Sequence, residues 1–241
     1  MINVPPQAPL VALAFLAASF LIAIGLAGAL FGALSKRPRL VARGAALAGV
    51  VASAYLIVWT GASLASRETL LATGETKYFC EIDCHLAYSV TGVEQVASLG
   101  AGGPAPASGS FLVVTLRTWF DPATISPRRP LDAPLWPNPR NVCAVDAEGR
   151  RYRPLPGTSA ALARAGRAST PLTEPLRPGE SYQTLLVFDV PREARGVKLY
   201  VGNHASEGAF LIGHEAAPIA KKAWFSLKVA EAERRETPVE P

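Results

Sequence analysis

The sequence predicts a membrane-anchored all-β protein, in which two N-terminal transmembrane helices are followed by an antiparallel β-sandwich. Residues 1–34 and 44–66 contain no charged side chain, although 18% of the 241 residues are charged overall. Beyond residue 77, short runs rich in β-branched and aromatic residues are separated by proline and glycine turns. The charge-free windows predict membrane spans, and the short runs predict strands of a domain outside the membrane.

Two apolar stretches are long enough to cross a bilayer, namely Leu10–Leu34 with 25 residues and Ala45–Ala65 with 21. A hydrocarbon core of about 30 Å needs roughly 20 helical residues. The first stretch has no positively charged start and is longer than the apolar core of a cleaved signal peptide. We therefore predict a retained helical hairpin within residues 1–66.

The loop between the spans, residues 35–44, predicts the orientation of the hairpin. It holds four basic residues and no acidic one: Lys36, Arg37, Arg39 and Arg43. Short basic loops remain in the cytoplasm, so we expect the N-terminus and everything after Ser66 on the extracytoplasmic side of a bacterial inner membrane. The net charge of the chain is +5, and these four basic residues account for most of it, because the remaining 20 basic and 19 acidic residues nearly cancel. This charge distribution is not that of a nucleic-acid-binding protein.

Three glycines of the first span, Gly25, Gly28 and Gly32, share one helix face. Small residues allow helix backbones to approach closely, so this face predicts a contact with the second span or with a helix of a partner subunit. Neither span contains an ionisable residue. Together these features favour an anchor over a transport path.

The exported part is predicted to begin with a connector over residues 67–77 and to continue as one immunoglobulin-like sandwich over 78–229. We expect only a fragmentary helix near Thr158–Ala168 and a polar tail over 230–241. The predicted strands are Leu86–Val90, Phe111–Trp119, Asn141–Val145, Tyr182–Val190, Val197–Val201 and Trp224–Val229. Both faces of Phe111–Trp119 are apolar at its start, which is typical of a central strand.

Two long segments interrupt the strands. Gly100–Gly109 is small and flexible in composition and has no side chains suited to chemistry. The Pro-rich insert, residues 122–139, contains six prolines together with Leu131, Leu135 and Trp136. These apolar side chains either pack onto the sandwich itself or form a surface for a partner protein.

Several turns and strands resemble a known family. The pattern comprises Phe111–Trp119, the turn Asp146-Ala-Glu-Gly149 before Tyr152, and Leu176-Arg-Pro-Gly-Glu180 leading to Leu185-Leu-Val-Phe-Asp-Val-Pro191. Over residues 82–229 it resembles the telokin-like, immunoglobulin-like domain of unknown function found in bacterial membrane proteins and lipoproteins. The resemblance implies an exported sandwich without catalytic residues. The Pro-rich insert and the cysteines depart from the family pattern.

The three cysteines, Cys80, Cys84 and Cys143, lie on the predicted exported side, where disulfides form and persist. We expect a disulfide, either from Cys80 or Cys84 to Cys143 or between Cys80 and Cys84, and its connectivity cannot be deduced from the sequence. Alternatively, Cys80, Cys84 and His85 form a copper or zinc site with a distant His204 or His214. A redox thiol is a further alternative. Covalent haem attachment needs C-x-x-C-H, whereas the spacing here is one residue longer.

The C-x-x-x-C spacing itself resembles the thiolate pair in the dinuclear copper domain of cytochrome oxidase subunit two. That domain places the pair near its end and uses a methionine ligand, whereas Met1 is the only methionine here. We predict no cofactor and no metal.

The sequence contains no nucleophile elbow and no phosphate-binding glycine loop. We therefore expect no enzyme activity. We expect the chain to be a non-catalytic accessory or scaffolding subunit of a larger membrane complex, for example a respiratory or photosynthetic one. Its expected partners are integral membrane subunits, their exported domains and the lipid bilayer. The alternatives are a self-standing ligand-binding module and a metal or electron-transfer protein that uses Cys80, Cys84 and His85.

Overall fold

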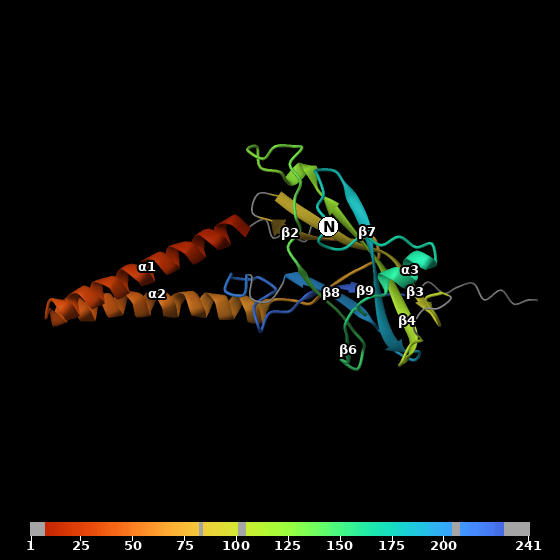
Figure 1. Cartoon of the computed structure of the whole chain (residues 1–241). Coiled ribbons are helices and arrows are strands. Elements are labelled where there is room, and N and C mark those ends of the chain that lie inside the picture. The colour runs from red at the N-terminus through yellow and green to blue at the C-terminus, as the bar shows by residue number, and fades with distance from the viewer. Residues whose placement is uncertain (1–7, 82–83, 101–104, 204–207, 229–241) are drawn as a thin grey trace, which may run out of the picture. The chain divides into compact units, whose positions relative to one another are not determined.

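The computed structural model describes residues 8–81, 84–100, 105–203 and 208–228 (Figure 1). The chain divides into two compact units. We call the first the helix unit, which comprises the described parts of Val4–Thr69 and Ala205–Ala223. The second is the β-domain, which comprises the described parts of Leu70–His204 and of the chain from Trp224 onward.

The helix unit is built on α1 (Ala8–Leu34) and α2 (Pro38–Ala65). Between them the chain turns through Lys36, which has a positive φ of 54°, and Pro38 stands in the first turn of α2, where a missing N–H costs little. In the described part of the chain both helices are long and apolar enough to cross a membrane. Only 6% and 11% of their most apolar windows are buried, unlike the core helix of a globular domain.

Close backbone approach joins the two helices. A Cβ atom on Gly25 would lie 2.8 Å from the backbone of Gly44, and one on Gly32 would lie 2.7 Å from the backbone nitrogen of Val41. A Cβ on Gly28, in contrast, meets nothing within 4 Å. Of the predicted glycine face, Gly25 and Gly32 therefore pack within the chain's own hairpin, whereas Gly28 points away from it.

In the described residues the β-domain contains two sheets built from antiparallel strand pairs. One sheet has the order β2-β3-β4-β7 and the other the order β1-β9-β8-β5-β6. The bounds of the first are β2 (Thr76–Glu81), β3 (Cys84–Val96), β4 (Gly109–Phe120) and β7 (Ser181–Pro191). Those of the second are β1 (Thr69–Leu71), β9 (Ala223–Ser226), β8 (Lys198–Asn203), β5 (Arg140–Val145) and β6 (Arg151–Tyr152).

The two sheets contribute to one hydrophobic core. Val114 of β4 and Phe188 of β7 belong to the same buried cluster as Leu199 of β8. A smaller cluster lies on the other face of β4, where Phe111 packs with the short helix α3 (Ser159–Arg164) through Leu162. Both faces of β4 are thus buried, which confirms the prediction of a central strand.

Every predicted strand occurs, with shifted ends, and the predicted helical fragment is α3. The strands that the sequence did not predict are β1, β2 and β6. The expected connector over 67–77 accordingly contains β1 and the start of β2, and strand Leu86–Val90 extends to the thirteen residues of β3. The predicted tail over 230–241 lies outside the described residues.

Candidate functional site

The Pro-rich insert connects β4 to β5, and its first residues are fixed to the hairpin of β2 and β3. It opens with the 3-10 turn η1 (Pro122–Thr124), where the Asp121 carboxylate accepts a 2.9 Å hydrogen bond from the backbone N–H of Ala123. The hydroxyl of Tyr78 donates to the other oxygen of Asp121 at 3.1 Å. The backbone N–H of His85 donates to Oγ1 of Thr124 at 2.9 Å. The start of the insert therefore has a defined position on the domain.

The middle of the insert pairs with the segment before β7. Leu135 and Leu176 exchange two backbone hydrogen bonds, of 2.9 and 3.0 Å, as in an antiparallel ladder. The Arg177 side chain donates to the carbonyl of Asp132 at 3.3 Å. Leu135 also packs against the hydrophobic core, while Leu176 belongs to it. Leu135 thus fastens the insert to the domain.

The end of the insert is fixed by a buried ion pair between Glu81 of β2 and Arg140 of β5. Their side chains are 5% and 1% exposed and lie in direct contact. Asn138, the penultimate residue of the insert, donates to the second Glu81 oxygen at 2.5 Å. Arg140 also donates to the Tyr88 hydroxyl at 3.2 Å and to Oδ1 of Asn203 at 2.8 Å. Each charge is therefore hydrogen-bonded to more than its ionic partner, as burial demands.

Aromatic rings complete the surroundings of this ion pair. The guanidinium of Arg140 lies 4.3 Å from the ring centre of Phe79, a distance typical of a cation–π contact. Burial raises the pKa of Tyr88, and the neighbouring Arg140 partly offsets that rise. Lys77 is also only 4% exposed, and its ammonium donates to the carbonyl of Val201 at 2.7 Å. These contacts join β2 to strands of the other sheet.

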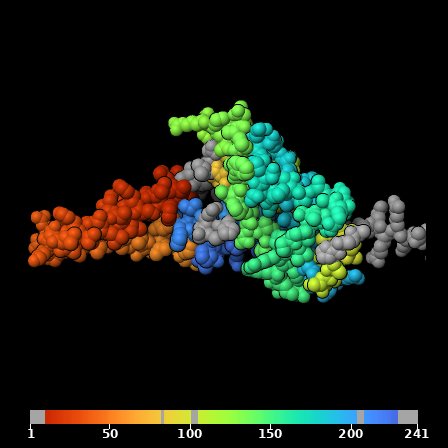
Figure 2. All heavy atoms as spheres, viewed as in Figure 1, coloured from red at the N-terminus to blue at the C-terminus, as the bar shows by residue number. Residues whose placement is uncertain are grey.

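The anchored insert presents two large apolar side chains to solvent. Leu131 is 72% exposed and Trp136 is 69% exposed, whereas their neighbour Leu135 is partly buried. In Figure 2 the green atoms at the start of the insert stand out from the surface of the β-domain. The two alternatives for the insert therefore apply to different residues: Leu135 packs onto the domain, and Leu131 and Trp136 remain available for contact.

The structure separates the residues of the cysteine motif. Cys80 pairs with His85 across β2 and β3, and Glu81 pairs with Cys84. Because opposed residues of an antiparallel pair share a face, Cys80 and His85 lie on one face while buried Cys84 lies on the core face. Burial lowers the pKa of His85, and the Asp121 carboxylate partly offsets this effect. The three side chains of the proposed metal set do not converge.

The predicted disulfide is not formed in the described residues. Cys80 is exposed on β2, whereas half-buried Cys143 lies on β5 in the other sheet. Cys143 alternates with Val142 and Ala144, which pack into the core, so its side chain points outward. Neither Cys80 nor buried Cys84 therefore faces Cys143.

The remaining candidates give no metal site in the described part of the chain, where no group of three or more His, Cys, Asp or Glu side chains is suitably placed. His204 lies outside the described residues, as do positions 101–104 of the Gly100–Gly109 segment. The imidazole of His214 accepts a 3.0 Å hydrogen bond from the backbone N–H of Ala216, which is a local structural role.

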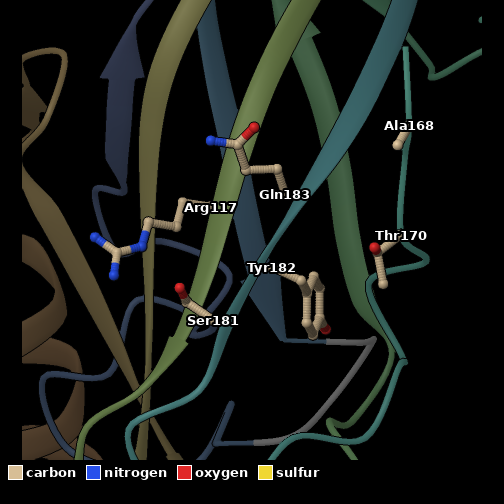
Figure 3. A pocket seen from close by; sticks show the side chains of 6 residues that line it. All are labelled: Arg117, Ala168, Thr170, Ser181, Tyr182 and Gln183. Atoms are coloured by element: carbon tan, nitrogen blue, oxygen red, sulfur yellow. The ribbon is translucent and has the colours of Figure 1, made fainter. Parts of the chain in front are cut away.

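A pocket of about 390 Å³ lies beside β4 and β7 (Figure 3). Its lining residues are Arg117, Ala168, Thr170, Ser181, Tyr182 and Gln183. In Figure 3 the Arg117 and Gln183 side chains point away from Thr170. Tyr182 donates to the carbonyl of Leu172 at 2.8 Å, and burial raises its pKa. The polar groups do not converge, so this pocket has no arrangement typical of ligand recognition.

Sequence reasoning missed a second irregular segment, residues 208–223, which we call the return segment because it joins the helix unit from far along the chain. The hydroxyl of Tyr55 donates to the carbonyl of Phe210 at 2.7 Å, and the indole of Trp59 donates to the carbonyl of Ala209 at 3.0 Å. The backbone N–H of Lys221 donates to Oγ of Ser66 at 2.7 Å. The only signal in the sequence is the apolar run Gly208-Ala-Phe-Leu-Ile-Gly213.

No protein-family model matches this sequence, and no curated protein sequence matches it. The domain-family resemblance therefore stays a prediction. Some solved structures are similar to the chain. MPT63, a secreted protein from Mycobacterium tuberculosis, is 13% identical with a TM-score of 0.42, over 67% of this chain and 99% of its own.

A conserved hypothetical protein from Bacillus anthracis is 17% identical with a TM-score of 0.39, over 54% of this chain and 89% of its own. The yjhA protein from Bacillus subtilis is 13% identical with a TM-score of 0.36, over 66% of this chain and 99% of its own. At these identities and TM-scores the likenesses carry no argument about function.

Proposed function

We propose that this chain is a non-catalytic accessory subunit of a larger complex in a bacterial inner membrane. In this proposal α1 and α2 cross the bilayer, with the basic loop in the cytoplasm and the β-domain, an immunoglobulin-like sandwich, outside it. The partner is an integral membrane protein with an exported domain that contacts the Pro-rich insert.

The observation that carries the proposal is the exposure of Trp136 and Leu131 on an insert that is fixed at its start, middle and end. Because the anchoring contacts hold the insert in one position, little conformational entropy is lost when a partner binds. Tryptophan is among the residues that contribute most to protein interfaces. An exposed tryptophan on a pre-organised segment therefore favours a docking role.

The test is extraction of the tagged full-length protein from its native membrane in mild detergent, with identification of the co-purifying proteins. We expect a membrane partner in stoichiometric amount, and its affinity should fall about 30-fold or more in Trp136→Ala/Leu131→Ala, as at an interface hot spot.

Leu70→Ala is the matched control, because Leu70 is an exposed leucine of β1 outside the insert. Recovery of the wild-type chain without a partner contradicts the proposal. An unchanged partner in the double variant contradicts the role of the insert.

A further inference from the structure

Residues 208–220 of the return segment have the composition of a membrane-contacting loop, and Lys221 and Lys222 follow them. Among residues 208–220 only His214 and Glu215 have ionisable side chains. Phe210 is 64% exposed and Ile219 is 45% exposed, so two large apolar side chains point away from the protein. The exposed apolar surface of α2 and that of this segment belong to the same unit.

Several backbone carbonyls of this segment accept hydrogen bonds from protein groups, as non-helical backbone needs inside a bilayer. The side chains of Trp59 and Tyr55 donate to the carbonyls of Ala209 and Phe210. Backbone N–H groups of the segment itself donate to further carbonyls, those of Gly208, Leu211, His214 and Ala217.

The polar groups at the end of the segment are likewise directed toward its own backbone. A carboxylate oxygen of Glu215 accepts a 3.1 Å hydrogen bond from the backbone N–H of Ala223. The ammonium of Lys222 donates to the carbonyl of Glu215 at 3.0 Å. The exposed positions among residues 208–220 are Phe210, Gly213, Pro218 and Ile219, whereas His214 and Glu215 are half-buried.

The depth of the segment follows from α2. About 20 helical residues cross the hydrocarbon core. Counted from Arg39 this length reaches Trp59, and counted from Arg43 it reaches Ser63. Tyr55 therefore lies at least one turn inside the outer boundary on either count. Helical side chains tilt toward the helix N-terminus, which for α2 is the cytoplasmic end. The Tyr55 hydroxyl therefore lies no nearer the outer boundary than its backbone does. Because this hydroxyl donates a hydrogen bond to the carbonyl of Phe210, that carbonyl lies at the same depth.

We propose that residues 208–220 insert into the outer leaflet of the bilayer, with Phe210 and Ile219 in contact with lipid acyl chains. This inference rests on the proposed two-pass anchor. It makes the β-domain membrane-bound at two separate points of the chain, the end of α2 and the return segment.

The test places the photoreactive residue p-benzoylphenylalanine at single positions of the full-length protein in vesicles of phosphatidylethanolamine and phosphatidylglycerol. Phe210→p-benzoylphenylalanine is the test variant, and the same change at Ile219 is a second one. Leu56, an exposed residue of α2, is the positive control. Gln183, which shares the polar surroundings of Arg117 and Ser181, is the negative control. Lipid adducts are measured by mass spectrometry after irradiation.

We expect lipid adducts at 210 and 219 at least about tenfold above those at 183, because benzophenone abstracts hydrogen only from C–H groups within its reach and acyl chains supply these only at a membrane-inserted position. Adducts at 56 without adducts at 210 and 219 would overturn the inference and leave the anchor intact. No adduct at 56 would refute the anchor itself. Cross-links from 210 to a second protein chain instead of lipid would also overturn the inference.

Discussion

Where α1 meets α2, glycine backbones approach each other directly, whereas where the two sheets of the β-domain meet, charged side chains are buried. Gly25 and Gly44 carry the first contact. Glu81 and Arg140 carry the second, together with the lysine at position 77. The difference follows from the two solvents for which we propose these units. A helix in lipid gains from close packing of small residues and avoids charge, while a domain in water can bury a charge that has a full set of partners.

The two units achieve specificity in different ways. The glycines determine how closely and at which positions the helices meet. The ion pair determines where the Pro-rich insert ends on the domain, because Asn138 and Arg140 both bind Glu81. The helix contact depends on glycines that have no Cβ atom, and the sheet contact depends on polar groups that match each other. Mutations should therefore damage the two contacts in different ways.

The largest effect is expected from Arg140→Met, which leaves the Glu81 carboxylate buried without its cation. Removing one partner of a buried pair costs about 3–5 kcal/mol, so the urea midpoint of the full chain in detergent, followed by tryptophan fluorescence, should fall sharply. Glu81→Gln/Arg140→Met should recover most of this loss, because neither charge remains. A loss below about 1 kcal/mol in the single variant would show that the pair is not buried as described.

An intermediate effect is expected from Gly44→Ala. Its Cβ would lie 2.5 Å from the backbone nitrogen of Ala29 and from the carbonyl of Gly25. Overpacking of this kind costs about 1–3 kcal/mol, measured as a shift of the unfolding curve of the full chain in dodecyl sulfate titrations. Gly49→Ala is the matched control, because a Cβ there meets nothing within 4 Å. Equal shifts in the two variants would contradict the glycine contact.

The smallest effect concerns a charged turn of the β-domain. Burial raises the pKa of the Asp146 carboxyl, but hydrogen bonds from Tyr152 and Arg150 outweigh burial and lower the pKa from 3.8 to about 2. A pKa lowered in the folded state stabilises the fold above pH 3.8, and that stabilisation is lost as the pH falls toward 2. Asp146→Asn should therefore show a smaller decrease of Tm between pH 4 and pH 2.

The control for this pH dependence is Asp132→Asn, which removes an exposed aspartate of the insert. Its Tm should follow the wild-type dependence on pH. Parallel curves for Asp146→Asn and the wild type would show that the turn contributes nothing to acid stability.

Much of the fold was predictable because apolar periodicity and turn residues are local signals. β2 was not predicted, because Lys77 and Glu81 interrupt an otherwise strand-like run. In the structure these charges and Phe79 are the buried positions of β2. Nothing near β2 in the sequence indicates that Arg140, 59 residues away, supplies the partner charge. A long-range pair of this kind has no local pattern.

The residues of the candidate site were predictable from the sequence, but the directions of their side chains were not. The sequence identified Leu131, Leu135 and Trp136 as apolar residues of the insert but not that Leu135 points inward, since this depends on its ladder with Leu176. The predicted disulfide failed because strand alternation turns Cys80 and Cys143 away from the core. Of the predicted glycine face, Gly25 and Gly32 contact α2, whereas Gly28 lies on the side away from α2.

The return segment also has a consequence for synthesis of the protein. Trp59 and its acceptor Ala209 are separated by 150 residues. At about 5–20 residues per second, the ribosome needs roughly 8–30 s to supply the acceptor after the donor has been made. The hairpin is therefore synthesised before its last contacts exist, and the β-domain is translated in between. Completion of the helix unit is a late event in biogenesis, one that a chain truncated before residue 208 never reaches.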